Sequence, residues 1–308
     1  MRIIILLLIS CLILPMHVAR AADANIIKIG TGGLLEGHYN IGLKLCRYIS
    51  QANDNIKCQV VPTQGSLDSL WLLQRGKIDF AFVLSNLAID SYKGTGYFTG
   101  TKPFKEMYQL LRLHDEIFTV LVKDDDKILV FADLDGRKLS NGPPNSDSSV
   151  AYKALEPYYD FKNSPIDVEL AYEDYAKAFC NGEIDAIMTM TGHPSSLVNL
   201  ISHSCEVDFA AIDADKIELL VKNNPGFHKV VLEAGKYPGV TEAQETVATP
   251  IIFVAGASVN KDIVKNFISY FKTKISRFKT NDPLLSGLED SHFMSEFVLP
   301  GFNDSIDE

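Results

Sequence analysis

Short apolar runs alternate with helix-like segments in the first third of the chain. Residues 26–29 and 78–84 are mostly apolar runs of strand length, and residues 57–61 are also predicted as a strand. Between them, a segment up to about Ser50 and the segment 67–75 are predicted as helices, the latter with leucines and a tryptophan at helical spacing. Strands that alternate with helices predict βαβ units and a parallel sheet.

A second series of the same kind follows. Two separate strands are predicted at 108–113 and 117–122, and then a second βαβ series of strands and helices between residues 138 and 212. The extended apolar run 246–259 is predicted to return to the first series, and residues 261–279 form an amphipathic helix.

The pattern therefore predicts an α/β protein of two lobes, each a mostly parallel sheet flanked by helices, with a ligand cleft between the lobes. The expected boundaries are residues 22–116 plus 251–308 for lobe 1 and 117–250 for lobe 2.

The first 21 residues have the pattern of a secretory signal peptide. A basic start precedes the apolar run 3–14, and Ala19-Arg20-Ala21 offers small residues for cleavage near Ala21. Lipidation at Cys11 and a retained anchor are the alternatives. An exported, periplasmic protein is expected, because no later stretch is long and apolar enough for a membrane helix.

Composition narrows the class of function. The formal net charge of the 308-residue chain is −10, which argues against nucleic acid as a partner. Four cysteines after the signal allow the local disulfides Cys46–Cys58 and Cys180–Cys205, and four buried thiols are the alternative. The histidines show no metal-binding spacing, so neither a metal nor a cofactor is expected.

The glycine-rich turn after the first strand is the first candidate site. Thr31, Gly32 and Gly33 precede a helix, and the free N–H groups of a helix start favour an anion. The turn does not match a dinucleotide motif, because Leu35 stands at the last position, and no Walker loop is present. A tight turn without a ligand is the alternative.

Further polar loops follow other predicted strands and fall on the same edge of a sheet. Ser66 and Ser85 lie in two of them, and Thr191 with Gly192 follows a strand of the second series. Ser146 and Ser148 stand where a helix begins, so capping of that helix is the alternative to ligand binding.

Five groups of residues together resemble the TAXI family of solute receptors of TRAP transporters. They are Ile29 to Gly33 with Tyr39 and Gly42; Thr63 to Ser66; Gly76 to Val83 with Ser85 and Gly94 to Gly96; Asp133 to Ser140 with Gly142 and Pro143; and Gly182 to Ala186 with Gly192 and Pro194. The resemblance extends over nearly the whole chain after the signal. It implies a type II periplasmic binding protein, a membrane permease driven by an ion gradient, and a small organic acid or amino acid such as glutamate as ligand.

The chain departs from the family pattern at several places, among them Leu84-Ser85-Asn86 and Leu299. Glu36 and Asp147 add negative charge near the supposed anion site, which favours an amino acid or a more neutral ligand over a simple dicarboxylate.

The expected mechanism is reversible capture without chemistry, by a monomer. The ligand contacts are predicted to be Thr31, Gly32, Gly33, Ser66 and Ser85 from lobe 1, Ser146, Ser148, Thr191 and Gly192 from lobe 2, and Tyr39 as a wall of the pocket. For Tyr39 a place in the core is the alternative, and for the nearby His193 a structural role. An exported enzyme and a receptor for a signalling partner are the competing functions, but no nucleophile motif such as G-x-S-x-G is present.

Overall fold

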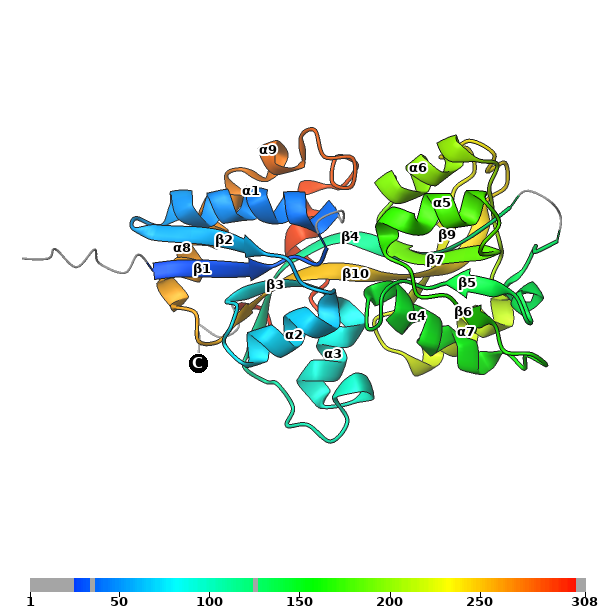
Figure 1. Ribbon diagram of the computed structural model, residues 1–308. Coiled ribbons are helices and arrows are strands. Elements are labelled where there is room, and N and C mark those ends of the chain that lie inside the picture. Colours follow the sequence, from blue (N-terminus) through cyan, green and yellow to red (C-terminus); the bar gives the residue numbers. More distant parts are fainter. Residues whose placement is uncertain (1–24, 34–36, 124–126, 303–308) are drawn as a thin grey trace, which may run out of the picture.

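The computed structural model describes residues 25–33, 37–123 and 127–302. The predicted signal peptide and Glu36 lie outside the described residues. Over the described ranges the chain forms two α/β lobes, which Figure 1 shows side by side. None of the helices in these ranges combines the length and the hydrophobicity that a bilayer crossing needs.

Strands and helices alternate as the hydrophobic pattern predicts. The strands are β1 Asn25–Gly30, β2 Ile56–Val61, β3 Phe80–Leu84, β4 Met107–Val122, β5 Lys138–Ser140, β6 Ile166–Asp167, β7 Ala186–Thr191, β8 Asp208–Phe209, β9 His228–Leu232 and β10 Gln244–Gly256. The helices are α1 Gly37–Ala52, α2 Ser66–Gln74, α3 Ser85–Lys93, α4 Asp147–Leu155, α5 Tyr175–Cys180, α6 Ser196–Ser204, α7 Ala214–Asn223, α8 Lys261–Lys272 and α9 Ile275–Lys279.

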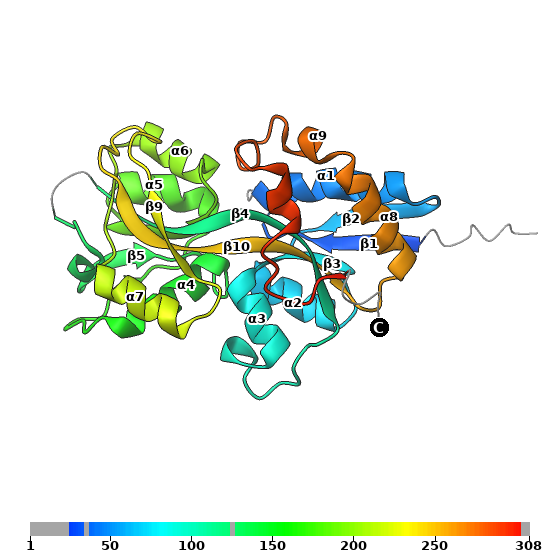
Figure 2. The same ribbon diagram turned by 180° about the vertical axis from the view of Figure 1, so that it is seen from behind.

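One sheet runs through both lobes in the order β2-β1-β3-β10-β4-β7-β5-β6. In lobe 1, β1 pairs in parallel with β2 and β3, and in lobe 2, β5 pairs in parallel with β6 and β7. The long antiparallel strands β4 and β10 cross between the lobes, as both ribbon views show (Figures 1 and 2). The two lobes are therefore joined by two continuous strands, β4 and β10, which pair with each other in antiparallel orientation.

Helices cover both faces of the sheet in each lobe. In lobe 1, α1, α8 and α9 lie on one side and α2 and α3 on the other, and in lobe 2, α5 and α6 lie opposite α4 and α7 (Figures 1 and 2). The core of lobe 1 includes the fully buried Phe80, Phe253 and Phe267, whereas lobe 2 has two separate apolar clusters around Phe131 and Phe179. Each buried phenylalanine stabilises the fold by about 1.5–3 kcal/mol.

An equivalent aspartate stands directly before one parallel strand of each lobe, Asp79 before β3 and Asp185 before β7. The Asp79 carboxylate accepts a hydrogen bond from the Lys28 N–H at 2.8 Å, and the Asp185 carboxylate accepts one from the Lys138 N–H at 2.9 Å. Each carboxylate ties the start of its strand to the neighbouring strand, so both aspartates have a structural role.

Three predicted elements differ from the structure. The two predicted strands 108–113 and 117–122 are one continuous strand, β4. Polar residues between them suggested a break, but two of these, His114 and Glu116, are buried within the strand at the boundary between the lobes. Ser66 and Ser85 are not loop residues but the first residues of α2 and α3. The single helix 261–279 is two helices, α8 and α9, which Thr273 and Lys274 separate.

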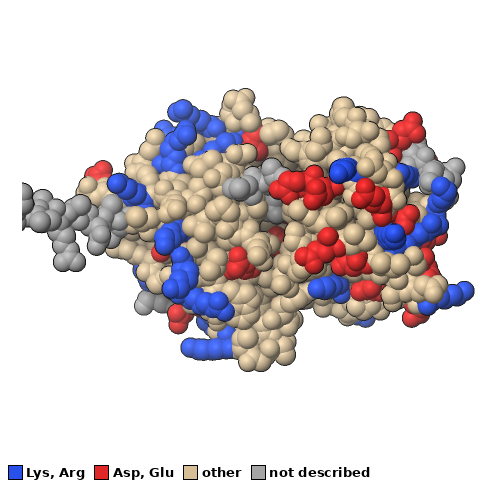
Figure 3. Space-filling model, in the orientation of Figure 1, with Lys and Arg blue, Asp and Glu red and all other residues tan. Residues whose placement is uncertain are grey.

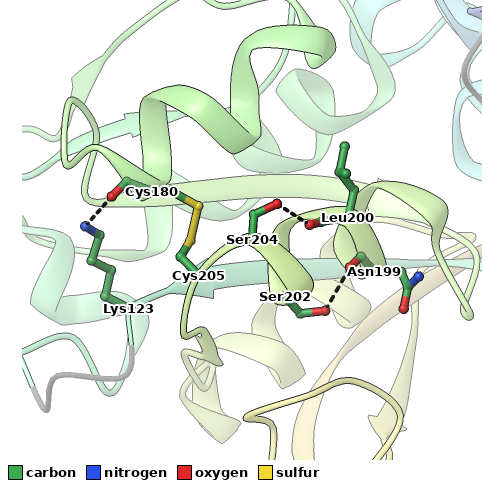
Figure 4. The surroundings of a disulfide bond; sticks show 7 residues. All are labelled: Lys123, Cys180, Asn199, Leu200, Ser202, Ser204 and Cys205. Atoms are coloured by element: carbon green, nitrogen blue, oxygen red, sulfur yellow. Dashed lines mark hydrogen bonds between the residues drawn. A yellow bond between two sulfur atoms is a disulfide. The ribbon is translucent and has the colours of Figure 1, made fainter.

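Both local cysteine pairs form disulfides, which decides between the two alternatives. Cys46 of α1 bonds Cys58 of β2, and Cys180 at the end of α5 bonds Cys205 directly after α6. The Lys123 Nζ donates a hydrogen bond to the Cys180 carbonyl at 3.3 Å (Figure 4). In the chain-entropy account, each closed loop of this length stabilises the fold by roughly 3 kcal/mol.

The predicted lobe boundaries fall opposite each other in the ladder between β4 and β10. Glu116 pairs with Thr249 and Asp115 pairs with Pro250, and the register of the ladder shifts between Pro250 and Ile252. Division of the chain into lobes at these residues stays a prediction.

Candidate functional site

A cavity of about 600 Å³ lies between the two lobes. Lobe 1 contributes the start of α1, Glu116 of β4 and the loop 281–284, and lobe 2 contributes the end of β7 and the start of α6. The lining residues are Gly37, His38, Asn40, Lys44, Glu116, Asp147, Tyr172, Glu173, Thr189, Met190, Thr191, Gly192, Pro194, Ser195, Ser196, Leu197, Leu200, Asn281, Asp282, Pro283 and Leu284.

Two helices from opposite lobes begin at this cavity. Gly37 is the first residue of α1 and Ser196 is the first residue of α6, and both line the cavity. The side chain of Ser195 caps α6 by accepting a hydrogen bond from the Val198 N–H. Helix starts carry partial positive charge, so each of these two ends favours an anionic group nearby.

Most charged side chains of the lining are negative, opposite to the partial positive charge of the two helix starts. The lining contains the acidic residues Glu116, Asp147, Glu173 and Asp282. Against these four, the described residues of the lining include one lysine, Lys44. The Lys44 Nζ lies 2.7 Å from an oxygen of Asp282, so its charge is already balanced. On the face seen in Figure 3, Asp and Glu gather on the right-hand lobe beside the boundary between the lobes. The cavity therefore favours a positively charged group beside these carboxylates, in addition to an anionic group at the two helix starts.

A cluster of two histidines and one glutamate forms part of the wall. Glu116 Oε1 lies 3.0 Å from His38 Nε2 and 2.9 Å from His114 Nε2, and the two imidazole rings are stacked with their centres 5.3 Å apart. Each of the three residues is at most 6% exposed. Burial by itself raises the pKa of Glu116, but the two neighbouring histidines outweigh it and lower this pKa to about 2. Glu116 is therefore a carboxylate throughout the physiological pH range.

His193 lies behind the cavity and holds the loop before α6. Its Nδ1 lies 2.6 Å from the Tyr237 hydroxyl, which accepts a hydrogen bond from the Ser195 N–H, and its Nε2 lies 2.9 Å from the Thr119 hydroxyl. His193 is not among the lining residues, which fits the structural role that was its alternative. Burial lowers the pKa of His193 to about 4.

We expect the pH dependence of stability to report on His193. Its folded-state pKa is depressed, so only the unfolded chain takes up this proton as the pH falls below about 6.5. The free energy of unfolding should therefore drop by about 2 kcal/mol from this residue between pH 7.5 and pH 5. Urea unfolding of wild type and His193→Gln at both pH values checks this. Equal pH dependence of the two proteins would contradict the assignment.

The predicted ligand contacts fall into two groups. Thr191 and Gly192 line the cavity. The others are not among its lining residues, and the structure gives most of their polar groups partners inside the protein. This second group is Thr31, Gly32, Gly33, Tyr39, Ser66, Ser85, Ser146 and Ser148.

In the glycine-rich turn, the backbone donors bond to the neighbouring strand and loop. The Thr31 N–H donates to the Val61 carbonyl at 3.2 Å, and the Gly32 N–H donates to the Thr63 hydroxyl at 2.9 Å. Gly32 has a φ of 77°, which explains why a glycine is needed there. In this conformation the turn is a structural one, so ligand binding by these two N–H groups stays a prediction.

The serines satisfy backbone and side-chain groups. Ser146 caps α4 by accepting from the Ser149 N–H, and the Ser148 hydroxyl accepts from the Met190 N–H at 2.9 Å. Ser85 shares a hydrogen bond of 2.9 Å with Thr249 of β10. Capping, the alternative for Ser146, is therefore what the structure has.

Ser66 makes a contact across the lobes. Its N–H and its hydroxyl lie 2.9 Å from the two carboxylate oxygens of Asp147, which is the first residue of α4. The start of α2 thus holds an anion, as the sequence predicts for such loops, but this anion belongs to the opposite lobe. We call this pair of hydrogen bonds the Ser66–Asp147 latch.

Sequence reasoning missed most of the polar wall. His38, Lys44 and Asp282 lie in helices or loops outside every motif, and Glu116 lies in the middle of a strand. The one local signal was the spacing of His114 and Glu116, because residues two apart in a strand point to the same face.

The comparisons with known proteins agree with this architecture. A model of the NMT1-like family matches residues 29–299. A solved Streptococcus mutans protein, from work on glutathione import by GshT and the cystine ABC importer TcyBC, is 10% identical with a TM-score of 0.53, and the match covers 86% of this chain and 97% of that one.

Two further solved structures are similar at the level of the fold. A Xanthomonas citri protein bound to chloride ion is 9% identical, with a TM-score of 0.51 over 87% of this chain and 93% of that one. A Bordetella bronchiseptica protein is 13% identical, with a TM-score of 0.50 over 87% of this chain and 79% of that one. These matches support a two-lobed fold of the binding-protein type.

Proposed function

This chain belongs to the NMT1-like family, and from this premise we propose that it is an exported receptor that captures a small solute between its lobes. The observation that carries the proposal is the cavity of about 600 Å³, lined by both lobes and approached by the first residues of α1 and α6. This arrangement suits capture of a small molecule without chemistry.

The lining favours an amino acid, or a similar zwitterion, as the solute. A carboxylate is stabilised by partial positive charge at the starts of α1 and α6. An ammonium group is stabilised by the carboxylates of the lining, chiefly Glu173 of lobe 2, since Asp282 is already paired with Lys44. A dicarboxylate would add two negative charges to a wall that already carries an excess of them, so its binding would be weaker.

The contacts we propose combine predicted residues with those that the fold adds. Thr191 and Gly192 bind from lobe 2, at the end of β7, and Lys44 and Glu116 bind from lobe 1. Charge-assisted hydrogen bonds of this kind contribute roughly 1.5–3 kcal/mol each.

Opening and closing around the solute uses the two crossing strands as a hinge. The proposed hinge lies where Glu116 pairs with Thr249, next to the shift of register in the ladder between β4 and β10. Only a closed state brings the contacts from both lobes together, so the solute favours closure through its differential affinity.

The proposed partner is a membrane permease that takes the solute from the receptor. The resemblance to TAXI-family receptors supports a TRAP-type permease driven by an ion gradient. Uptake into membrane vesicles that stops when the ion gradient is collapsed, and continues when ATP is depleted, would fit this partner. The reverse dependence would instead fit an ATP-driven importer.

A thermal-shift screen tests the receptor function. The panel contains zwitterionic and basic amino acids, glutamate, dicarboxylates and neutral sugars, each with the mature protein. At a concentration 100-fold above Kd, a true solute stabilises the protein by about 2.7 kcal/mol and raises Tm by about 5 °C. We expect amino acids to give this shift and dicarboxylates to give less. A panel in which sugars shift Tm and no amino acid does would overturn the proposed solute class.

A further inference from the structure

We propose that His38, His114 and Glu116 bind a divalent transition-metal ion of the zinc type in the wall of the cavity, with an open coordination position that faces the solute. This inference deepens the proposed function and rests on it only for the role of the solute, since metal binding itself needs no solute. The motif spacing along the chain predicts no metal site, because the fold brings these residues together from separate elements.

Two elements converge to place the three side chains. His114 and Glu116 stand two residues apart on β4, so they project from the same face of the strand. His38 is the second residue of α1 and approaches the same carboxylate oxygen of Glu116. One ligand atom from each residue lies within 4.8 Å of the other two. The cluster thus has the size of a metal site before any ion is considered.

The distances fit the coordination of zinc. Zinc binds histidine nitrogen and carboxylate oxygen at about 2.0–2.2 Å, so neighbouring ligand atoms of a tetrahedral ion lie about 3.3 Å apart. Glu116 Oε1 lies 3.0 Å and 2.9 Å from the two Nε2 atoms, so modest side-chain movement admits an ion between them. Two histidines and one glutamate, with a fourth position left open, are a known zinc ligand set.

The buried charge also favours a cation. The Glu116 carboxyl group is only 5% exposed, and a buried carboxyl group is costly unless polar partners compensate it. The wall adds the carboxylates of Asp147, Glu173 and Asp282, with Lys44 as the counter-charge among the lining residues. A divalent ion between the three ligands adds positive charge where the wall has this excess of carboxylates.

The side of the three-residue cluster that faces the cavity has space for a further ligand. A Cβ at Gly192 would come within 2.5 Å of His114 Cδ2 and 2.8 Å of His114 Nε2, so the glycine keeps the space beside this nitrogen open. Since His38, Glu116 and Gly192 line the cavity, the open position faces the solute. The carboxylate of an amino acid would fill this open position, while its ammonium group stays beside the carboxylates of the wall.

Calorimetric titration with zinc chloride tests the site. The protein carries no histidine tag and is freed of metal by dialysis against a chelator. We expect one zinc ion per chain with Kd below about 10 μM, which corresponds to more than about 6.8 kcal/mol of binding free energy. Glu116→Gln and His114→Ala should each weaken binding at least 100-fold. His203→Gln, which removes an exposed histidine of α6, is the matched control and should leave Kd unchanged.

A second measurement does not depend on the folding of the variants. Cobalt added to the metal-free wild-type protein should give the intense visible absorption of a tetrahedral site, and equimolar zinc should remove it. The proposal is overturned if no stoichiometric binding occurs, or if the triad variants bind zinc as the wild type does. If amino acids raise Tm in metal-free protein that binds no zinc, the metal site fails and the receptor function stands. If zinc binds and no solute shifts Tm, the metal site stands and the proposed receptor function fails.

Discussion

Ser196→Trp is expected to weaken solute binding at least 100-fold. Ser196 is exposed and is the first residue of α6, so a larger side chain is accommodated without repacking a core. The residue lines the cavity from lobe 2, and an indole there occupies the space of the solute and keeps α6 away from lobe 1. The loss corresponds to about 2.7 kcal/mol or more of binding free energy. Calorimetry with the amino acid selected by the thermal-shift screen measures it.

The matched control is Asn199→Trp, one turn further along the same helix. Asn199 is exposed and is not among the lining residues, so this variant should bind the solute within about twofold of wild type. Both variants should keep the Tm of the unliganded protein within about 2 °C, because surface substitutions usually change stability little. Equal affinity of Ser196→Trp and wild type would place the solute outside this cavity.

Asp147→Ala is expected to open the unliganded protein. The Ser66–Asp147 latch joins the starts of α2 and α4 by two hydrogen bonds of 2.9 Å, both to a charged carboxylate. At about 1.5–3 kcal/mol for each charge-assisted hydrogen bond, removal of both shifts the balance between closed and open states by at least about 100-fold. Small-angle X-ray scattering should show a larger radius of gyration for the variant.

Two further variants separate the latch from general charge effects. Asp147→Asn keeps the shape of the side chain and removes the charge, so its radius of gyration should fall between those of wild type and Asp147→Ala. Asp68→Ala removes a carboxylate from the first turn of α2 whose partner is Gln64 of the same lobe, and it should leave the scattering unchanged. Identical scattering curves for wild type and Asp147→Ala would show that the latch does not hold the lobes.

Much of the fold was readable from local pattern. Apolar runs such as residues 78–84, separated by segments with helical spacing, predict buried parallel strands, and β3 and its parallel pairing with β1 follow that expectation. The sequence indicated which cysteines could pair locally. It could not show whether each pair is a disulfide or two buried thiols, because both states have the same sequence. The centre of β4 was misread, since its polarity reflects the boundary between the lobes rather than a turn.

The site was harder to predict because it depends on contacts between distant segments. Thr191 and Gly192 were found since they follow a strand of the second lobe. The sequence predicted a ligand as the partner of the Gly32 N–H. Its actual partner is the Thr63 hydroxyl, which lies in a different loop and could not be foreseen from the local sequence. His38 and Glu116 belong to no motif, and only the fold brings the start of α1 close enough to β4 for the two side chains to meet.

The most direct test of the account is a crystal structure of the protein with the amino acid selected by the thermal-shift screen. We predict electron density for the solute in the cavity between the lobes, in contact with Lys44 or Glu116 from lobe 1 and with Thr191 or Gly192 from lobe 2. Density outside this cavity, or contacts with one lobe alone, would contradict capture between the lobes.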